Sequence, residues 1–133
     1  MIGIYENFEL IDSFKSNEKA SDFIVFTMNK ILKEYKISSL IYANGPGSFM
    51  GIKVAYLILK TISIIKKIPF KAIDGFKLNN NAPIKANKTL SFVYDNEEIK
   101  LRKIESKPLN LPKNLLNLKL NNDTLPNYVI GEI

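Results

Sequence analysis

The sequence predicts an α/β domain, and three observations support this prediction. Alternating apolar residues over 2–15 are typical of a β-hairpin. Two segments with helical periodicity follow, at about 16–35 and 50–67. Short apolar segments at 38–43 and 70–73 flank the second of these. A strand, a helix and a strand in that order form a βαβ unit, in which the two strands are parallel.

Local signals set the bounds of each element. The hairpin turns at Glu6-Asn7, between strands at 2–5 and 8–15. Residues 16–18 supply a helix N-cap with an acidic residue in the first turn. A glycine-proline loop at 44–49 precedes the second helix, and Asp74-Gly75 ends the third strand. These elements form a predicted core domain at 1–78.

Beyond residue 79 the composition shifts toward asparagine, lysine and proline. A second hairpin is expected from strands at 90–94 and 99–104, joined through 95–98. Residues 106–126 are expected to be an irregular connector, and 127–133 a short terminal element. Residues 79–133 therefore form a predicted shortened C-terminal segment.

The composition excludes several kinds of chemistry. The chain has 133 residues, 46% hydrophobic and 24% charged, which suits one packed core. It contains no cysteine and no histidine, which removes thiolate nucleophiles, histidine bases and nearly all zinc sites. Asp12, Asp22 and Asp74 stand on separate elements as caps or turn residues. We therefore predict no catalytic residue, no metal and no cofactor.

No membrane association is expected either. The apolar stretch 52–65 is interrupted by Lys53, Lys60 and Ser63, so it is a poor candidate for a membrane span. No signal peptide is expected at the start, and a cytoplasmic location is the natural expectation.

The net charge of +6 raises the question of nucleic-acid binding. Arg102 is the single arginine, and the lysines are scattered over all elements. Lysine lacks the planar fork with which arginine recognises bases and phosphates. An RNA-binding accessory domain stays open as an alternative, and it predicts salt-dependent affinity for tRNA.

The glycine loop at 44–51 is the most informative segment. Glycine permits unusual backbone angles, Pro46 stiffens the turn, and Ser48 can cap the helix that follows. One interpretation is a rigid turn without a ligand. A phosphate cradle at the helix N-terminus is another, although Lys53 follows Ile52 and so breaks the Walker pattern. Dinucleotide binding is a third, with the last glycine one residue late and a proline in place of an N–H donor.

The same loop resembles the signature of the TsaB (YeaZ) family, commonly written GPGSFTG followed by Ile or Leu and then Arg. The matching loop residues are Gly45, Pro46, Gly47, Ser48, Phe49 and Gly51. The first hairpin, the first helix and Ile68-Pro69 extend the similarity over about 2–78. Met50 replaces the usual threonine, Lys53 the arginine and Ala20 a frequent histidine. The resemblance is to a short or reduced member.

The resemblance implies a reduced actin-like or ribonuclease H-like domain with a mixed sheet and two main helices on one side. It implies a non-catalytic scaffold, with no enzyme activity of its own. Such a subunit binds and stabilises TsaD, the transferase that makes threonylcarbamoyladenosine in bacterial tRNA, with TsaE as ATPase partner in the complex. Homodimers are a further expectation, and tRNA is contacted only indirectly. A small nucleotide-binding module built on Gly45–Gly51 stays open as the alternative.

Two apolar stripes on the second helix indicate a partner. The first stripe is predicted to pack on the sheet and comprises Gly51, Val54, Ala55, Ile58, Ile62 and Ile65. The second stripe lies on the far side of the helix and comprises Ile52, Tyr56, Leu59 and Ser63. A helix that is apolar on two sides is normally covered on both. On the first helix, Phe26 is predicted to lie opposite the core residues, with Phe23 beside it. The predicted docking face comprises Phe26, Ile52, Tyr56, Leu59 and Ser63, with Lys53 and Lys60 at its rim. The alternative is that the C-terminal segment folds back over the aromatic residues.

Overall fold

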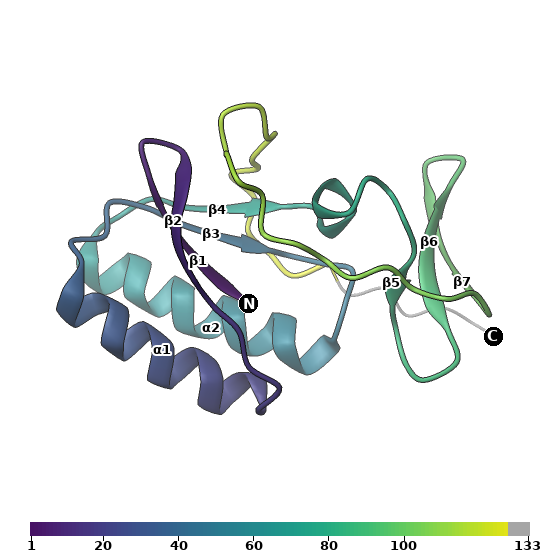
Figure 1. Cartoon of the computed structure of the whole chain (residues 1–133), viewed down its shortest axis with the longest axis horizontal. Coiled ribbons are helices and arrows are strands. Elements are labelled where there is room, and N and C mark those ends of the chain that lie inside the picture. The colour runs from purple at the N-terminus through teal and green to yellow at the C-terminus, as the bar shows by residue number, and fades with distance from the viewer. Residues whose placement is uncertain (128–133) are drawn as a thin grey trace.

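The computed structural model describes residues 1–127, and it has the α/β character that the sequence predicts. A hairpin of β1 (Ile2–Glu6) and β2 (Glu9–Phe14) leads into α1 (Ala20–Glu34). Then follow β3 (Leu40–Ala43), α2 (Phe49–Lys66) and β4 (Phe70–Ile73). The helices α1 and α2 lie side by side along one side of the strands (Figure 1).

The βαβ prediction is confirmed, since β3 and β4 pair in parallel from Leu40 with Phe70 to Ala43 with Ile73. The prediction of one mixed sheet is wrong. Strands β1 and β2 form one antiparallel sheet, with a register shift between Ile4 and Tyr5, and β3 and β4 form another. The helix N-cap also differs from the prediction: α1 starts after Lys19 without a side-chain cap, and Ser16 Oγ accepts from Glu18 N instead.

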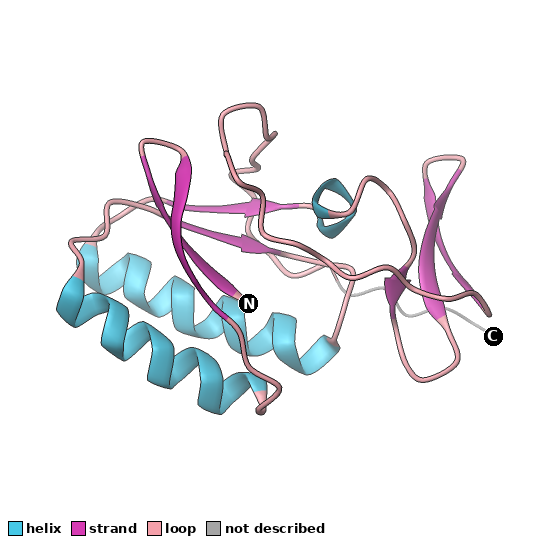
Figure 2. Cartoon of the chain, viewed as in Figure 1, coloured by secondary structure: helices cyan, strands magenta, loops and turns pink. Residues whose placement is uncertain are grey.

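The second part of the chain forms a smaller unit of strands (Figure 2). A 3-10 turn at Gly75–Leu78 is capped by Asp74 and precedes β5 (Ile84–Lys85). The predicted second hairpin is confirmed as β6 (Ser91–Asp95) and β7 (Glu98–Arg102), and β5 joins it as a third strand. Phe76, Ile84 and Phe92 form the buried cluster of this unit.

The predicted irregular connector at 106–126 is confirmed, and it returns to the first part of the chain. Leu10 N donates to Lys113 O at 2.9 Å, and Leu115 N donates to Phe8 O at 2.8 Å, so the connector pairs with the first hairpin. Further on, Asn121 exchanges backbone hydrogen bonds with Ala72 of β4. Of the predicted terminal element at 127–133, all but Asn127 lies outside the described residues.

The main core lies between the two helices and strands β1, β3 and β4. Met28 and Ile31 of α1 meet Ile52 and Leu59 of α2 in this cluster, and β-strand residues close it. Tyr42 stacks on Phe70 with ring centroids 5.1 Å apart, and its hydroxyl donates to the Thr124 carbonyl. The tyrosine therefore joins β3 to both β4 and the C-terminal connector.

Replacing Tyr5 by phenylalanine should destabilise the fold, because the Tyr5 hydroxyl joins the hairpin to the connector. It donates to the Pro112 carbonyl at 2.6 Å, and burial raises the pKa of Tyr5 above its ordinary value of 10.0. We expect Tyr5→Phe to lower the free energy of unfolding by about 1 kcal/mol at neutral pH, the usual net contribution of one hydrogen bond.

The pH dependence provides a control for this prediction. A raised pKa means that the folded state favours the protonated hydroxyl, so its contribution is present below pH 10 and is lost as the pH rises through the raised pKa. Urea unfolding at pH 7 and above pH 10 should therefore show the Tyr5→Phe difference shrinking in alkali. Equal stability of the two proteins at pH 7 would contradict the role of this bond.

Candidate functional site: the outer face of the two helices

Helix α2 is fixed at both ends by serine side chains. At its start, Ser48 Oγ accepts from Gly51 N at 3.3 Å, which confirms the predicted cap. At its end, Lys67 adopts a left-handed conformation with φ 56°, and Ser63 Oγ donates to the Ile68 carbonyl at 2.6 Å. These caps set where α2 begins and ends, whereas the face that it exposes is set by the packing of Ile52 and Leu59 in the main core.

The predicted docking face on α2 is wrong. Ile52 and Leu59 belong to the main core, with 8% and 9% of their surface exposed. Tyr56 is half-buried, and its ring lies 6.1 Å from Tyr42 and 6.2 Å from Phe70, so it packs within the molecule. Ser63 caps its own helix. These four side chains therefore serve the fold of this chain.

The predicted core stripe is wrong in part for the same reason. Ile65 was expected to pack on the sheet, yet 70% of its surface is exposed. Ala55, Ile58 and Ile62 are half-buried at the edge of the core, where α2 runs beside α1. Apolar residues surround α2 on nearly every side, so the sequence pattern alone did not distinguish the inner face from the outer one.

A third stripe on α2 is the one that solvent reaches. Met50, Leu57 and Ile64 are 62%, 52% and 65% exposed. They stand seven residues apart, which places them on one line along the helix, about 120° to 160° from the buried Ile52. Val54 and Thr61 complete the stripe at alternating spacings of four and three, the pattern of helices that pack against other helices. We call these five residues the outer stripe.

Helix α1 adds further exposed apolar side chains. Phe26 is 74% exposed and Val25 is 53% exposed, while Thr27, Met28 and Ile31 point into the core. The prediction that Phe26 lies opposite the core is confirmed, and Phe23 is half-buried. The described C-terminal segment therefore does not cover Phe26. We call the outer stripe together with Val25, Phe26 and Ile65 the outer helix face.

All charged side chains on α2 are lysines, so the charge beside the outer stripe is positive. Lys53, Lys60 and Lys66 are exposed, and α2 contains no acidic residue. The predicted rim lysines Lys53 and Lys60 thus lie beside Leu57 and Ile64, one third of a turn or less around the helix. An apolar stripe flanked by lysines favours a partner surface with apolar side chains at its centre and acidic ones at its edge.

The glycine loop is held by contacts within the chain. Gly75 N donates to Gly45 O at 2.9 Å, and Asn127 N donates to Asn44 O at 2.7 Å. Gly45 has φ 121°, and a Cβ there would lie 2.4 Å from the Asn127 carbonyl oxygen, so only glycine fits. Gly45 and the cis-linked Pro46 are buried, whereas Ser48 and Phe49 are exposed. This arrangement matches the rigid strand-to-helix turn among the three interpretations.

The site residues that the sequence reasoning missed are Met50, Leu57 and Ile64. A signal for them was present, because residues 50, 54, 57, 61 and 64 follow the alternating spacing of a packing helix. Two other apolar stripes on the same helix are of similar hydrophobicity, so the spacing alone did not single this one out. The structure separates the three stripes, because the core and α1 cover two of them.

Comparison of the chain with protein-family models, with curated proteins and with solved structures finds no match. Within residues 1–127, acidic side chains do not gather in groups of three or more that could hold a metal ion. Neither helix in this part of the chain is long and apolar enough to cross a membrane.

Proposed function

We propose that this protein is a non-catalytic docking subunit similar to TsaB, which binds and stabilises a TsaD transferase through the outer helix face. The observation that carries the proposal is the exposed line of Met50, Leu57 and Ile64. Isolated apolar side chains are common on protein surfaces, but a line of exposed apolar side chains along one helix, with further ones on the adjacent helix, is typical of an interaction site.

The physical basis of docking is burial of this face against a second helical surface. The spacing of the outer stripe suits helices that cross at a shallow angle, as they do in a bundle. Phe26 and Leu57 are the natural anchors, because large apolar side chains contribute most at the centre of an interface. The lysines beside them orient the partner through its acidic residues.

The loop sequence supports the same proposal. Its similarity to the TsaB signature concerns residues that build a tight turn at the start of α2, in which Gly45 and Pro46 are buried. The proposed role of the loop is therefore to set the position of α2 and of the outer stripe on it. In this proposal TsaE and tRNA are reached through TsaD, and the complex acts in the cytoplasm on threonylcarbamoyladenosine formation.

Sedimentation velocity tests the proposal directly. The chain is measured alone and mixed with TsaD from the same organism, in the absence of tRNA and nucleotide. We expect a stoichiometric complex with TsaD, with or without a homodimer of the free chain. A chain that stays monomeric alone and in the mixture would overturn the proposal. Binding of tRNA by the isolated chain, decreasing steeply with salt, would favour the RNA-binding alternative.

A further inference from the structure

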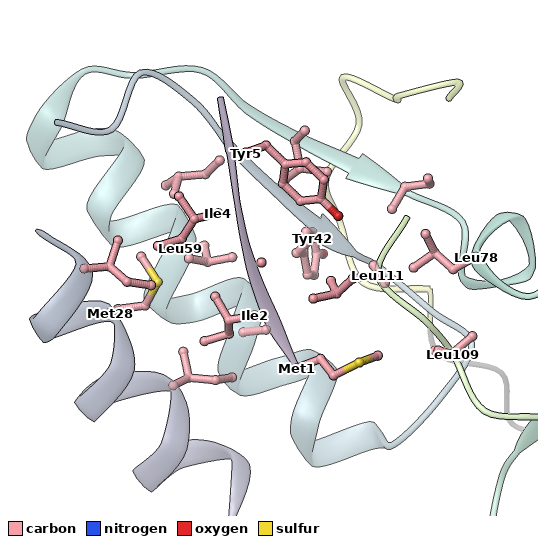
Figure 3. A pocket seen from close by; sticks show the side chains of 18 of the residues that line it. Met1, Ile2, Ile4, Tyr5, Met28, Tyr42, Leu59, Leu78, Leu109 and Leu111 are labelled. Carbon is pink, nitrogen blue, oxygen red and sulfur yellow. The ribbon is translucent and has the colours of Figure 1, made fainter. Parts of the chain in front are cut away.

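A large apolar cavity lies between the two small sheets of the first part of the chain. Its volume is about 840 Å³, and its lining includes every residue of β1 and every residue of β3. Met28 and Leu59 reach it from the helices, and Leu111 reaches it from the connector (Figure 3). The charged side chains of the lining are Glu6, Glu18 and Lys36, and all three are exposed. The rest of the wall is mainly apolar and is formed largely by side chains of the main core, such as Ile4, Leu40 and Leu59. Met1 also lies in the lining, and burial lowers the pKa of its amino group.

Within residues 1–127, the two strands that border the cavity each pair with another strand along one edge only, β1 with β2 and β3 with β4. Leu40 N and Asn44 N donate to Pro69 and Ile73 on the β4 side. Since backbone groups alternate in direction along a strand, those of Ile41 and Ala43 point to the opposite edge, where the cavity lies. The cavity thus combines apolar side chains with backbone donors and acceptors along its walls.

This combination determines the chemistry of an occupant. Backbone N–H and C=O groups in an apolar site are costly when they have no partner. An aliphatic ligand would satisfy the side chains and leave these groups unpaired. A polypeptide in extended conformation satisfies both, since it pairs with two strand edges and places side chains on either face. With β1 five residues long, the matching segment is about five residues, or about 17 Å.

We propose that the cavity is a strand-acceptor site, which binds an extended and uncharged segment of a partner polypeptide between β1 and β3. The segment would join the two small sheets into one, with apolar residues on both of its faces. This site is separate from the outer helix face, so its test is independent of the proposed function.

Titration calorimetry with a synthetic peptide tests this proposal. The probe is a capped peptide with a core of about five valine and isoleucine residues and serine at both ends. The matched control peptide has the same side chains and carries N-methyl groups on alternate core residues, which removes ladder donors. We expect the first peptide to bind at one site, and the N-methylated peptide to bind at least about tenfold more weakly, which corresponds to loss of two hydrogen bonds.

A matched pair of variants locates the binding at β3. Ile41→Pro removes the N–H that points toward the cavity, whereas Ile41→Val keeps it. We expect Ile41→Pro to weaken peptide binding about tenfold or more and Ile41→Val to bind like the natural protein, with unchanged far-UV circular dichroism in both. If Ile41→Pro does not fold, the comparison of the two peptides on the natural protein decides the question.

Three outcomes would overturn the proposal. Equal affinity for the two peptides would show that backbone pairing is not involved. Displacement of the peptide by dodecanoate, with dodecanoate binding more tightly, would identify a site for aliphatic ligands. Absence of peptide binding would show that the edges of β1 and β3 are satisfied in another way, either by water or by a second copy, and sedimentation velocity distinguishes these two.

Discussion

Leu57→Asp is expected to weaken the proposed docking strongly while leaving the fold intact. Leu57 lies in the middle of the outer stripe, and half of its surface is exposed in the free protein. An aspartate there loses little in the isolated chain, because it remains in water. In the proposed complex it places a charge at the centre of an apolar interface, where no cation is expected to pair with it. We expect TsaD binding to weaken by at least about 2 kcal/mol, or roughly 30-fold.

Sedimentation velocity of the Leu57→Asp chain with TsaD measures this effect, and thermal unfolding checks the fold. Lys60→Gln serves as the matched control on the same helix, since a rim lysine alters mainly the association rate and its salt dependence. Ile64→Asp should behave like Leu57→Asp. A Leu57→Asp chain that is folded and binds TsaD as tightly as the natural protein would remove the outer stripe from the interface.

Leu59→Asp, only two residues further along the helix, is expected to prevent folding. Leu59 is 9% exposed and packs in the main core with Met28 and Ile31. The cluster offers no cationic side chain to pair with a carboxylate, so the charge would be buried without compensation. The milder change Leu59→Ala should lower the free energy of unfolding by about 2–5 kcal/mol, as is usual for a truncated core leucine.

Urea unfolding followed by circular dichroism measures both substitutions, with Leu57→Ala as the matched surface control. That control should change stability by about 0.5 kcal/mol or less, because it removes few internal contacts. If Leu59→Asp folded normally, or if Leu57→Ala were as damaging as Leu59→Ala, the assignment of inner and outer faces would be reversed. The two positions together determine which side of α2 faces the core.

The order and type of the elements followed from local signals in the sequence. Alternation predicted the first hairpin, two short segments joined through 95–98 predicted the second, and Ser48 after the glycine loop predicted the start of α2, which the cap to Gly51 confirms. The βαβ unit followed from element order, because a strand, helix and strand of this length leave few other arrangements. These features depend on neighbours within a few residues, and such information is fully present in the chain.

The mixed sheet that the family resemblance implied is not what the described chain has, since its strands form separate small sheets. Pairing between strands depends on contacts between residues far apart, and no local pattern showed that β1 and β3 stay apart. The cavity between β1 and β3 could not be predicted from the sequence for the same reason. The contact of the connector with Phe8, Leu10 and Ala72 was also unforeseen, because its residues carry no periodic pattern.

By itself the sequence determined that α2 is a helix with too many apolar faces for one core, and that this chain lacks histidine and cysteine chemistry. Only the tertiary structure decided that Ile52 and Leu59 face inward and that Met50, Leu57 and Ile64 face solvent. The physical reason is that several apolar stripes on one helix are nearly equivalent in hydrophobicity. The choice among them is made by the residues they meet across the core, on α1, β3 and β4.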